Sequence, residues 1–215
     1  MSKRICTRVN ISPSFKYFLT IMRDRTSTVD TYRSASDNAA LQLLQAVFGY
    51  LLIHDKTIET PTNSNYTGID IDVTTLCGVS VVRAGESMEG PLRQLFPKIA
   101  IGKILIQRDE ETLKPKLYHT KLPKNIAERT VIVMEPMLAT GGTALCTIKT
   151  LLDFGVSENK IIFVSFVGCR TGLDKVQKTH PKVQFIIGEI DPTLNSVGYI
   201  IPGLGDAGDR YFGTT

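Results

Sequence analysis

Short runs of β-branched and aliphatic residues alternate with amphipathic stretches through the second half of the chain. Uninterrupted apolar runs are typical of strands that are buried on both faces. Apolar residues at three- and four-residue spacing predict helices between them. The alternation predicts an α/β fold with a parallel sheet flanked by helices. The predicted strands are residues 79–82, 99–107, 131–134, 161–168 and 183–190, and the predicted helices are residues 85–96, 143–154 and 173–180.

The first half of the chain carries a weaker pattern. Residues 1–33 are polar without a clear period, which predicts irregular structure. Apolar residues at helical spacing predict a helix over residues 37–53, capped by a polar side chain at 34–37. Residues 60–68 are rich in turn-forming types and predict a loop. The charged stretch 108–123 contains prolines and predicts a protruding arm rather than core.

Composition narrows the class of protein. Of the 215 residues, 42% are hydrophobic and 21% are charged, which is typical of a globular chain. The formal charge of +4 is too small for a nucleic-acid-binding surface and suits small anionic ligands. No apolar run approaches the ~18 residues that span a bilayer. The first residues also lack the apolar core of a signal peptide. Neither nucleic acid nor a membrane is therefore an expected partner.

The cysteines do not form a metal-binding pattern. No CxxC pair occurs, so no metal site made by the protein alone is expected. Cys77, Cys146 and Cys169 lie in apolar or helical contexts, where free buried thiols are the simpler interpretation. Free thiols indicate a reducing compartment, and we therefore expect a cytoplasmic location.

The segment VIVMEPMLATGGTA (131–144) joins a predicted strand to a predicted helix. In an open parallel sheet, ligands bind beyond the carboxyl ends of the strands. Gly141 and Gly142 allow several backbone N–H groups to surround one anion, and the helix N-terminus adds its dipole. Thr140 and Thr143 add hydroxyl donors. We interpret the turn as a phosphate site, with a plain strand–turn–helix corner as the alternative; a P-loop is excluded because its Gly-Lys-Ser/Thr ending is missing.

One carboxylate, Glu135, precedes this turn. A carboxylate repels phosphate, but it accepts hydrogen bonds from a pair of hydroxyls such as the 2′- and 3′-OH of ribose. A phosphate site beside a diol site indicates a phosphorylated ribose. In the simpler alternative, Glu135 only interacts favourably with the helix dipole.

Four segments resemble the uracil phosphoribosyltransferase family. VIVMEPMLATGGT closely resembles its phosphoribosyl-pyrophosphate motif, although the family usually has Asp where this chain has Glu135. The resemblance runs from about residue 76 to the end of the chain and implies a Rossmann-like type I phosphoribosyltransferase fold. The other segments are VRAGESME (82–89), GKILIQRDEET (102–112) and YIIPGLGDAGDRYFGT (199–214).

The resemblance implies a division of the chain. Residues 1–215 would form one phosphoribosyltransferase domain with three accessory parts. These parts are an N-terminal extension (1–35), a β-arm (108–123) and a small C-terminal hood that binds uracil (191–215).

The resemblance also implies roles for two arginines, each of which follows a predicted strand. Arg83 and Arg108 would hold the diphosphate of the ribose donor, because a guanidinium matches paired anionic oxygens. In the alternative, both are ordinary surface arginines. Mg²⁺ would be bound chiefly through the diphosphate, because the chain offers few carboxylates there. The implied donor-binding residues are Arg83, Arg108, Glu135, Pro136, Met137, Leu138, Ala139, Thr140, Gly141, Gly142, Thr143 and Asp206, and the catalytic candidates are Arg83, Arg108 and Asp206.

The glycine-rich segment GLGDAG (203–208) formally matches a dinucleotide-binding pattern. Too few residues follow it for the helix and βαβ unit that such a site needs. A glycine-rich backbone can instead approach a flat pyrimidine and read its edge. The resemblance assigns Ile200, Gly205, Asp206 and Ala207 to uracil and its neighbourhood, with Asp206 serving the donor, a cation or a water molecule. A disordered tail is the alternative, which the aromatic residues of this segment disfavour.

The implied reaction transfers the phosphoribosyl group of 5-phospho-α-D-ribose 1-diphosphate (PRPP) to uracil N1, giving UMP and diphosphate in pyrimidine salvage. A GTP effector and a homodimer or homotetramer are further expectations from the family. Two alternatives remain open. One is a phosphoribosyltransferase for another base, and the other is a non-catalytic protein that keeps the fold to sense UMP or bind RNA.

Overall fold

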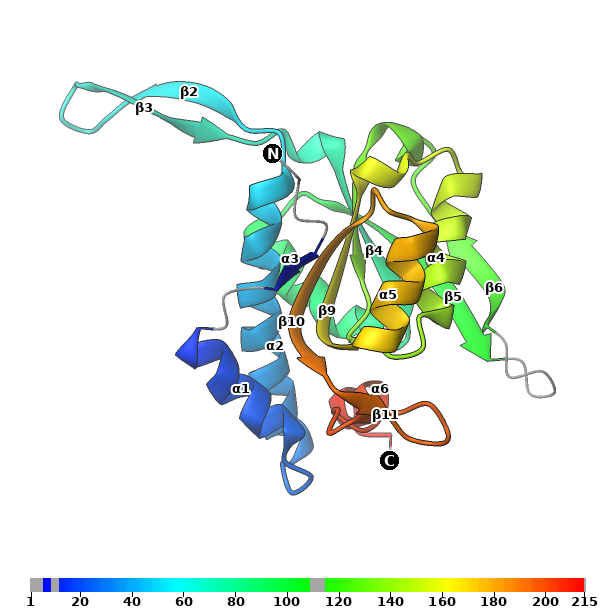
Figure 1. Ribbon diagram of the computed structural model, residues 1–215. Coiled ribbons are helices and arrows are strands. Elements are labelled where there is room, and N and C mark those ends of the chain that lie inside the picture. Colours follow the sequence, from blue (N-terminus) through cyan, green and yellow to red (C-terminus); the bar gives the residue numbers. More distant parts are fainter. Residues whose placement is uncertain (1–5, 9–11, 109–114, 215) are drawn as a thin grey trace.

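The computed structural model describes residues 6–8, 12–108 and 115–214 and is built around one large sheet (Figure 1). The strands of this sheet are β1 (Cys6–Arg8), β4 (Leu76–Val82), β5 (Ala100–Arg108), β6 (Pro115–Lys121), β7 (Thr130–Met134), β8 (Met137–Leu138), β9 (Ile161–Cys169) and β10 (Gln184–Asp191). Their order is β1-β10-β9-β7-β4-β5-β6, with β8 beside β9. All pairings are parallel except β5 with β6 at one edge. The expected α/β fold is confirmed.

Helices cover both faces of the sheet (Figure 1). Alternate residues of β9 point to opposite faces, and every residue of this strand is buried, as its unbroken apolar sequence predicts. Two buried clusters follow from this arrangement, one on each face. The first packs against α1 (Pro13–Arg23), α2 (Val29–Gln45) and α3 (Glu89–Leu95), and the second packs against α4 (Gly142–Asp153) and α5 (Arg170–Thr179).

The predicted strands and helices of the second half are confirmed with small shifts of their ends. The helix predicted over residues 85–96 is divided into a 3₁₀ turn (Ala84–Met88) and α3. Pro91 explains the division, because proline fits only the first turn of an α-helix, where its missing N–H costs nothing. Gly155 has the positive φ of +87° that suits the residue after a helix end, and α4 ends shortly before it.

The prediction of irregular structure for residues 1–33 is wrong for most of its described part, which holds β1, α1 and the start of α2, whereas residues 1–5 and 9–11 lie outside the described residues. Ser12 caps α1 by accepting the N–H of Phe15 at 3.1 Å, and Pro13 occupies its first position. Phe15, Leu19 and Met22 are its buried residues and lie at helical spacing, so the apolar period that predicts this helix is present in the sequence.

The helix predicted over residues 37–53 exists as α2, but it begins at Val29. Thr28 caps it, so the expected cap at 34–37 lies within the helix. The helix predicted for residues 46–53 is replaced by a 3₁₀ turn over Ala46–Tyr50.

A hairpin protrudes from the body beyond α2 (Figure 1). It consists of β2 (His54–Glu59) and β3 (Asn65–Asp70), so the loop predicted over residues 60–68 is confirmed only for the connecting turn. The sequence shows no clear alternation of apolar and polar residues along these strands, because both faces of the hairpin are largely exposed.

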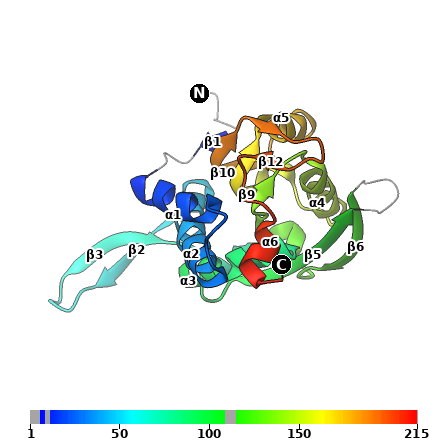
Figure 2. The same cartoon turned by 90° about the horizontal axis from the view of Figure 1, so that it is seen from below.

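The C-terminal hood lies beyond the carboxyl end of β10. It contains a short pair of strands, β11 (Thr193–Leu194) and β12 (Ile200–Ile201), and a helix, α6 (Ala207–Phe212). The expectation of no helix after the glycine-rich segment is therefore wrong. Figure 1 shows α6 below the sheet, and Figure 2, seen from that side, shows it in front of the sheet near α2, against which it packs. Among the residues that the structure describes, no helix combines the length and apolar character that crossing a membrane requires.

Candidate active site

A cavity of about 320 Å³ lies beyond the carboxyl ends of β7 and β8. Two segments that are far apart in the sequence share its wall. One is the turn that leads into α4, and the other belongs to the hood. The lining residues are Glu135, Met137, Leu138, Ala139, Thr140, Gly141, Gly142, Thr143, Ala144, Gly198, Tyr199, Ile200 and Asp206.

The turn before α4 has the geometry of an anion cradle. Gly141 is in the left-handed region with φ of +76°, which a residue with a side chain rarely adopts. None of the described side chains caps α4, and its first turn holds no acidic residue. The first N–H groups of a helix have no intrahelical acceptor, and here they border the cavity. They are therefore available to an anionic ligand.

Glu135 follows β7 directly and is fixed through its main chain. Its N–H donates to the Val164 carbonyl at 3.2 Å, and its own carbonyl accepts from Ser165 Oγ at 2.6 Å. Its side chain lines the cavity, and burial alone raises the pKa of its carboxyl to about 8. Among the described residues no cation pairs with this carboxyl, so it is mostly protonated at neutral pH in the free chain.

The hood residues predicted to read a base divide into two groups. Ile200 and Asp206 line the cavity, whereas Gly205 and Ala207 lie outside its lining. Gly205 has φ of +71° and is exposed, and Ala207 is the buried first residue of α6. Asp206 caps α6, because its Oδ1 accepts the N–H of Asp209 at 2.9 Å. Pro136, the remaining motif residue outside the lining, is buried, and its carbonyl accepts from Phe166 N at 2.9 Å.

The two predicted arginines follow neighbouring strands at the cavity edge of the sheet. β4 pairs in parallel with both β5 and β7, so the positions after β4 and at the end of β5 lie at the same edge as the cradle. The Arg83 guanidinium does not line the cavity; it donates to Asp209 and, at 2.7 Å, to Thr214 Oγ1. Arg108 ends β5, where its main chain pairs with Pro115, and its side chain lies outside the described residues.

Comparison with known proteins identifies the family. The model of the uracil phosphoribosyltransferase family matches residues 9–214. The chain belongs to this family. It is 46% identical to the uracil phosphoribosyltransferase of Dictyostelium discoideum over 93% of this chain and 92% of that protein. It is 42% identical to the uracil phosphoribosyltransferase of Saccharomyces cerevisiae over 90% of this chain and 89% of that protein. A solved structure of an Aquifex aeolicus protein covers 98% of this chain and 99% of its own, with a TM-score of 0.88 and 27% identity.

Several residues that support the walls of this cavity were not predicted from the sequence. Arg23 and Arg210 bind main-chain carbonyls of the hood, and Asp191 accepts a main-chain N–H there. Gly172, at the start of α5, packs against the cradle from below. None of these residues forms a local motif. The stripe of apolar residues in α1 is the one signal that would have placed Arg23 at the end of a helix.

The described side chains fit the expectation that Mg²⁺ is bound chiefly through the diphosphate. Within residues 6–8, 12–108 and 115–214, no group of three or more His, Cys, Asp or Glu side chains is placed to hold a metal ion. Two carboxylates, Glu135 and Asp206, do lie on the cavity wall. They are oxygen ligands of the kind that Mg²⁺ prefers when phosphates supply the remaining ligands.

Proposed function

We propose that this chain transfers the 5-phosphoribosyl group of PRPP to uracil N1, releasing diphosphate and forming UMP in pyrimidine salvage. The observation that carries the proposal is the single cavity shared by the cradle and the hood. One wall offers groups that suit a phosphorylated sugar, and the other offers backbone that suits a base. Membership of the uracil phosphoribosyltransferase family supports the choice of base.

The cavity suggests a role for each segment. Residues 137–143 would hold the 5′-phosphate with the N–H groups at the start of α4. Glu135 would accept hydrogen bonds from the two ribose hydroxyls. Ile200 would contact uracil and Asp206 would lie between sugar and base, with Gly205 and Ala207 supporting the hood backbone just outside the cavity lining. Cytosine would place an amino donor where uracil has a carbonyl acceptor, which leaves polar groups unpaired at a cost of ~1–3 kcal/mol.

The chemistry asks the protein for positioning and charge stabilisation. The bond between C1 and the diphosphate oxygen breaks while the bond between C1 and uracil N1 forms, through a transition state that resembles an oxocarbenium ion. The N1 proton of uracil leaves to the departing diphosphate or to solvent. Arg83 and Arg108 would stabilise the departing diphosphate, because positive charges fixed in advance favour developing negative charge. The arm would exclude water, and Pro115 at the start of β6 already lies against Gly142 of the cradle.

Mg²⁺ would accompany the diphosphate in this site. Asp206 and Glu135 are the wall carboxylates that could hold it, with most of its ligands coming from the substrate. When bound, the ion would neutralise part of the charge on the diphosphate.

The test is release of diphosphate from PRPP with Mg²⁺ and each of uracil, cytosine, hypoxanthine and orotate, with and without GTP. We expect release with uracil alone among these bases. Release with another base would replace the proposed substrate, and binding of UMP without any release would support the non-catalytic alternative. The comparison with and without GTP tests whether GTP is an effector.

Glu135 gives a pH-dependent prediction. The carboxyl is protonated below a pH of about 8 in the free chain, whereas the ribose hydroxyls favour the ionised form, so binding of PRPP releases a proton there. Affinity should therefore rise as the pH increases toward 8, by up to about tenfold per pH unit, and level off above it. Calorimetric titration of PRPP across this range measures the slope.

The matched variant is Glu135→Gln, which keeps the side-chain size and removes the titration. It shares any titration of PRPP itself, so the difference between the two slopes belongs to Glu135. Parallel slopes in both proteins would show that Glu135 does not bind the sugar.

We also propose that the chain forms a homodimer or homotetramer. The hairpin of β2 and β3 exposes Ile58, Tyr66 and Ile69, with 48%, 60% and 63% of their surfaces accessible. A two-stranded hairpin is marginally stable alone, and a second copy would cover these side chains. Sedimentation velocity measures the state; a monomer at assay concentration would contradict the proposal.

A further inference from the structure

One partly buried ion pair joins the end of α1 to the hood. Arg23 donates through Nη1 to Asp191 Oδ2 at 2.9 Å and through Nη2 to Asp191 Oδ1 at 2.7 Å. The same Nη1 donates to the Gly203 carbonyl at 2.9 Å, and Asp191 Oδ2 accepts the Gly203 N–H at 2.9 Å. Asp191 is only 2% exposed. Both main-chain polar groups of Gly203 are therefore held by this single pair.

Gly203 controls the path of the segment that faces the cavity. Its φ is +62°, and a Cβ atom there would lie 2.1 Å from the Ile200 carbonyl oxygen. The backbone therefore turns tightly back on Ile200, which lines the cavity. Gly205 and Asp206 follow immediately along the chain. A displacement of Gly203 must move residues on both sides of it, and these are the ones proposed to contact uracil or to support the hood backbone beside it.

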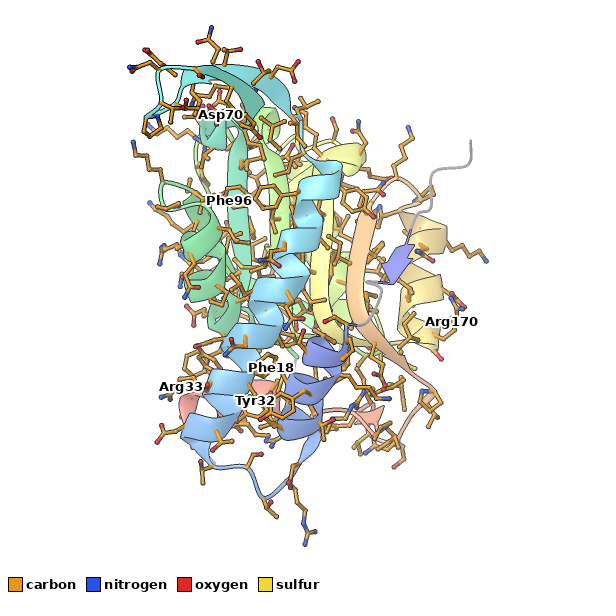
Figure 3. The ribbon with its side chains drawn as sticks, turned by 90° about the vertical axis from the view of Figure 1, so that its left-hand side faces the viewer. Phe18, Tyr32, Arg33, Asp70, Phe96 and Arg170 are labelled. Atoms are coloured by element: carbon orange, nitrogen blue, oxygen red, sulfur yellow. The ribbon has the colours of Figure 1, made fainter. Side chains whose placement is uncertain are left out.

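A second guanidinium connects the hood back to the end of α1. Arg210, in α6, donates to the Leu204 carbonyl at 2.8 Å, to the Met22 carbonyl, and to the Asp24 carbonyl at 2.6 Å. Its Cζ lies 4.3 Å from the centre of the Tyr32 ring. Figure 3 shows Tyr32 on the end of α2 that lies near α1 and the hood. The N-terminal helices and the hood are thus joined by two arginines. Arg23 reaches from α1 to the hood, and Arg210 reaches from the hood to the end of α1.

We propose that Arg23 is a positioning residue for base recognition: through Asp191 and Gly203 it fixes the hood backbone that reads uracil. The proposal rests on the proposed function and gives the N-terminal helices a part in substrate selection. A guanidinium is required because it reaches both carboxylate oxygens and a carbonyl at once, which an ammonium group cannot do with the same fixed fork. Its removal leaves Asp191 buried without its charge partner.

The experiment compares two ligands that share a phosphoribosyl group and differ in the base. In the proposed site, the base of UMP would contact the hood and its phosphoribosyl group the cradle, whereas ribose 5-phosphate has no base for the hood to read. We expect Arg23→Gln to weaken UMP binding by ~10-fold or more, the loss expected for a misplaced hydrogen bond, and to change ribose 5-phosphate binding by less than about twofold. Arg23→Lys should lie between wild type and Arg23→Gln. Isothermal calorimetry measures both affinities.

Arg33→Gln is the matched control. Arg33 also donates to a hood carbonyl, that of Tyr211, at 3.0 Å, and it lies on the neighbouring helix α2. Its contact is at the far end of α6, away from the cavity lining. We expect Arg33→Gln to lower the melting temperature without changing the ratio of the two affinities. A selective loss of UMP in this control would make the effect a general loosening of the hood and overturn the proposal.

Other results are equally decisive. Equal weakening of both ligands by Arg23→Gln, or unchanged binding of both, would leave Arg23 only a structural contact. If Arg23→Gln does not fold, Arg23→Lys and Asp191→Asn, which keeps an acceptor for the Gly203 N–H, give the same comparison of ligands. Failure of the wild-type chain to release diphosphate from PRPP and uracil would contradict the proposed function, whereas the positioning role is measured by the ratio of UMP to ribose 5-phosphate affinity.

Discussion

Gly172→Ala is expected to lower the affinity for PRPP by ~100-fold, although Gly172 lies outside the cavity lining. A Cβ atom at this position would lie 2.1 Å from the Ala139 carbonyl oxygen and 2.8 Å from the Gly141 nitrogen. Both contacts are with backbone that forms the cradle, and backbone held in a turn cannot rotate aside as a side chain can. The methyl group must therefore displace either α5 or the cradle. A displacement of about 1 Å is enough to cost two orders of magnitude when ligand groups must meet several N–H donors together.

Gly90→Ala is the matched control. It makes the same change in α3, where a Cβ atom would meet nothing within 4 Å. Alanine should stabilise that helix by up to about 1 kcal/mol without altering PRPP binding. Calorimetric titration of PRPP, with thermal unfolding of each variant, measures both effects. A folded Gly172→Ala protein with wild-type PRPP affinity would show that the cradle does not bind the donor.

The part of the site that could be predicted is the part that is local in sequence. The turn at 137–143 carries its own glycines, follows an unbroken apolar strand and precedes an amphipathic helix, so the shape of the cradle follows from neighbouring residues. The strand pattern is equally local, because burial on both faces removes polar residues from the whole run. These predictions needed no knowledge of how distant segments meet.

The rest depends on contacts between segments that are distant in sequence. Gly172 becomes important only when α5 packs under the cradle, and Arg23 only when α1 reaches Asp191, which is 168 residues further along the chain. The short helix α6 was missed for another reason. With only six residues, it is too short to show a helical period, and its cap Asp206 lies in a glycine-rich segment that favours a loop.

Arg83 is the residue for which sequence and structure suggest different partners. The family resemblance assigns its guanidinium to the diphosphate, whereas the structure shows it bound to Asp209 and Thr214 of the hood. A hydrogen bond from Thr214 lowers the pKa of the Asp209 carboxyl most, and one from Arg83 lowers it further, so Asp209 carries its charge at neutral pH. A diphosphate that binds Arg83 must therefore compete with this carboxylate.

We expect Arg83→Ala to lower kcat/KM by ~100-fold or more, the loss typical of a charge that stabilises a departing anion. Asp209→Asn removes the competing carboxylate while Arg83 remains, so its KM for PRPP should be unchanged or lower than that of the wild type. Steady-state kinetics with PRPP and uracil measure both. If Arg83 only attached the hood to the end of β4, the two variants would break the same contact and lose activity together. The opposite responses of the two variants are therefore what the diphosphate role requires, and equal losses would assign Arg83 to the structure of the hood.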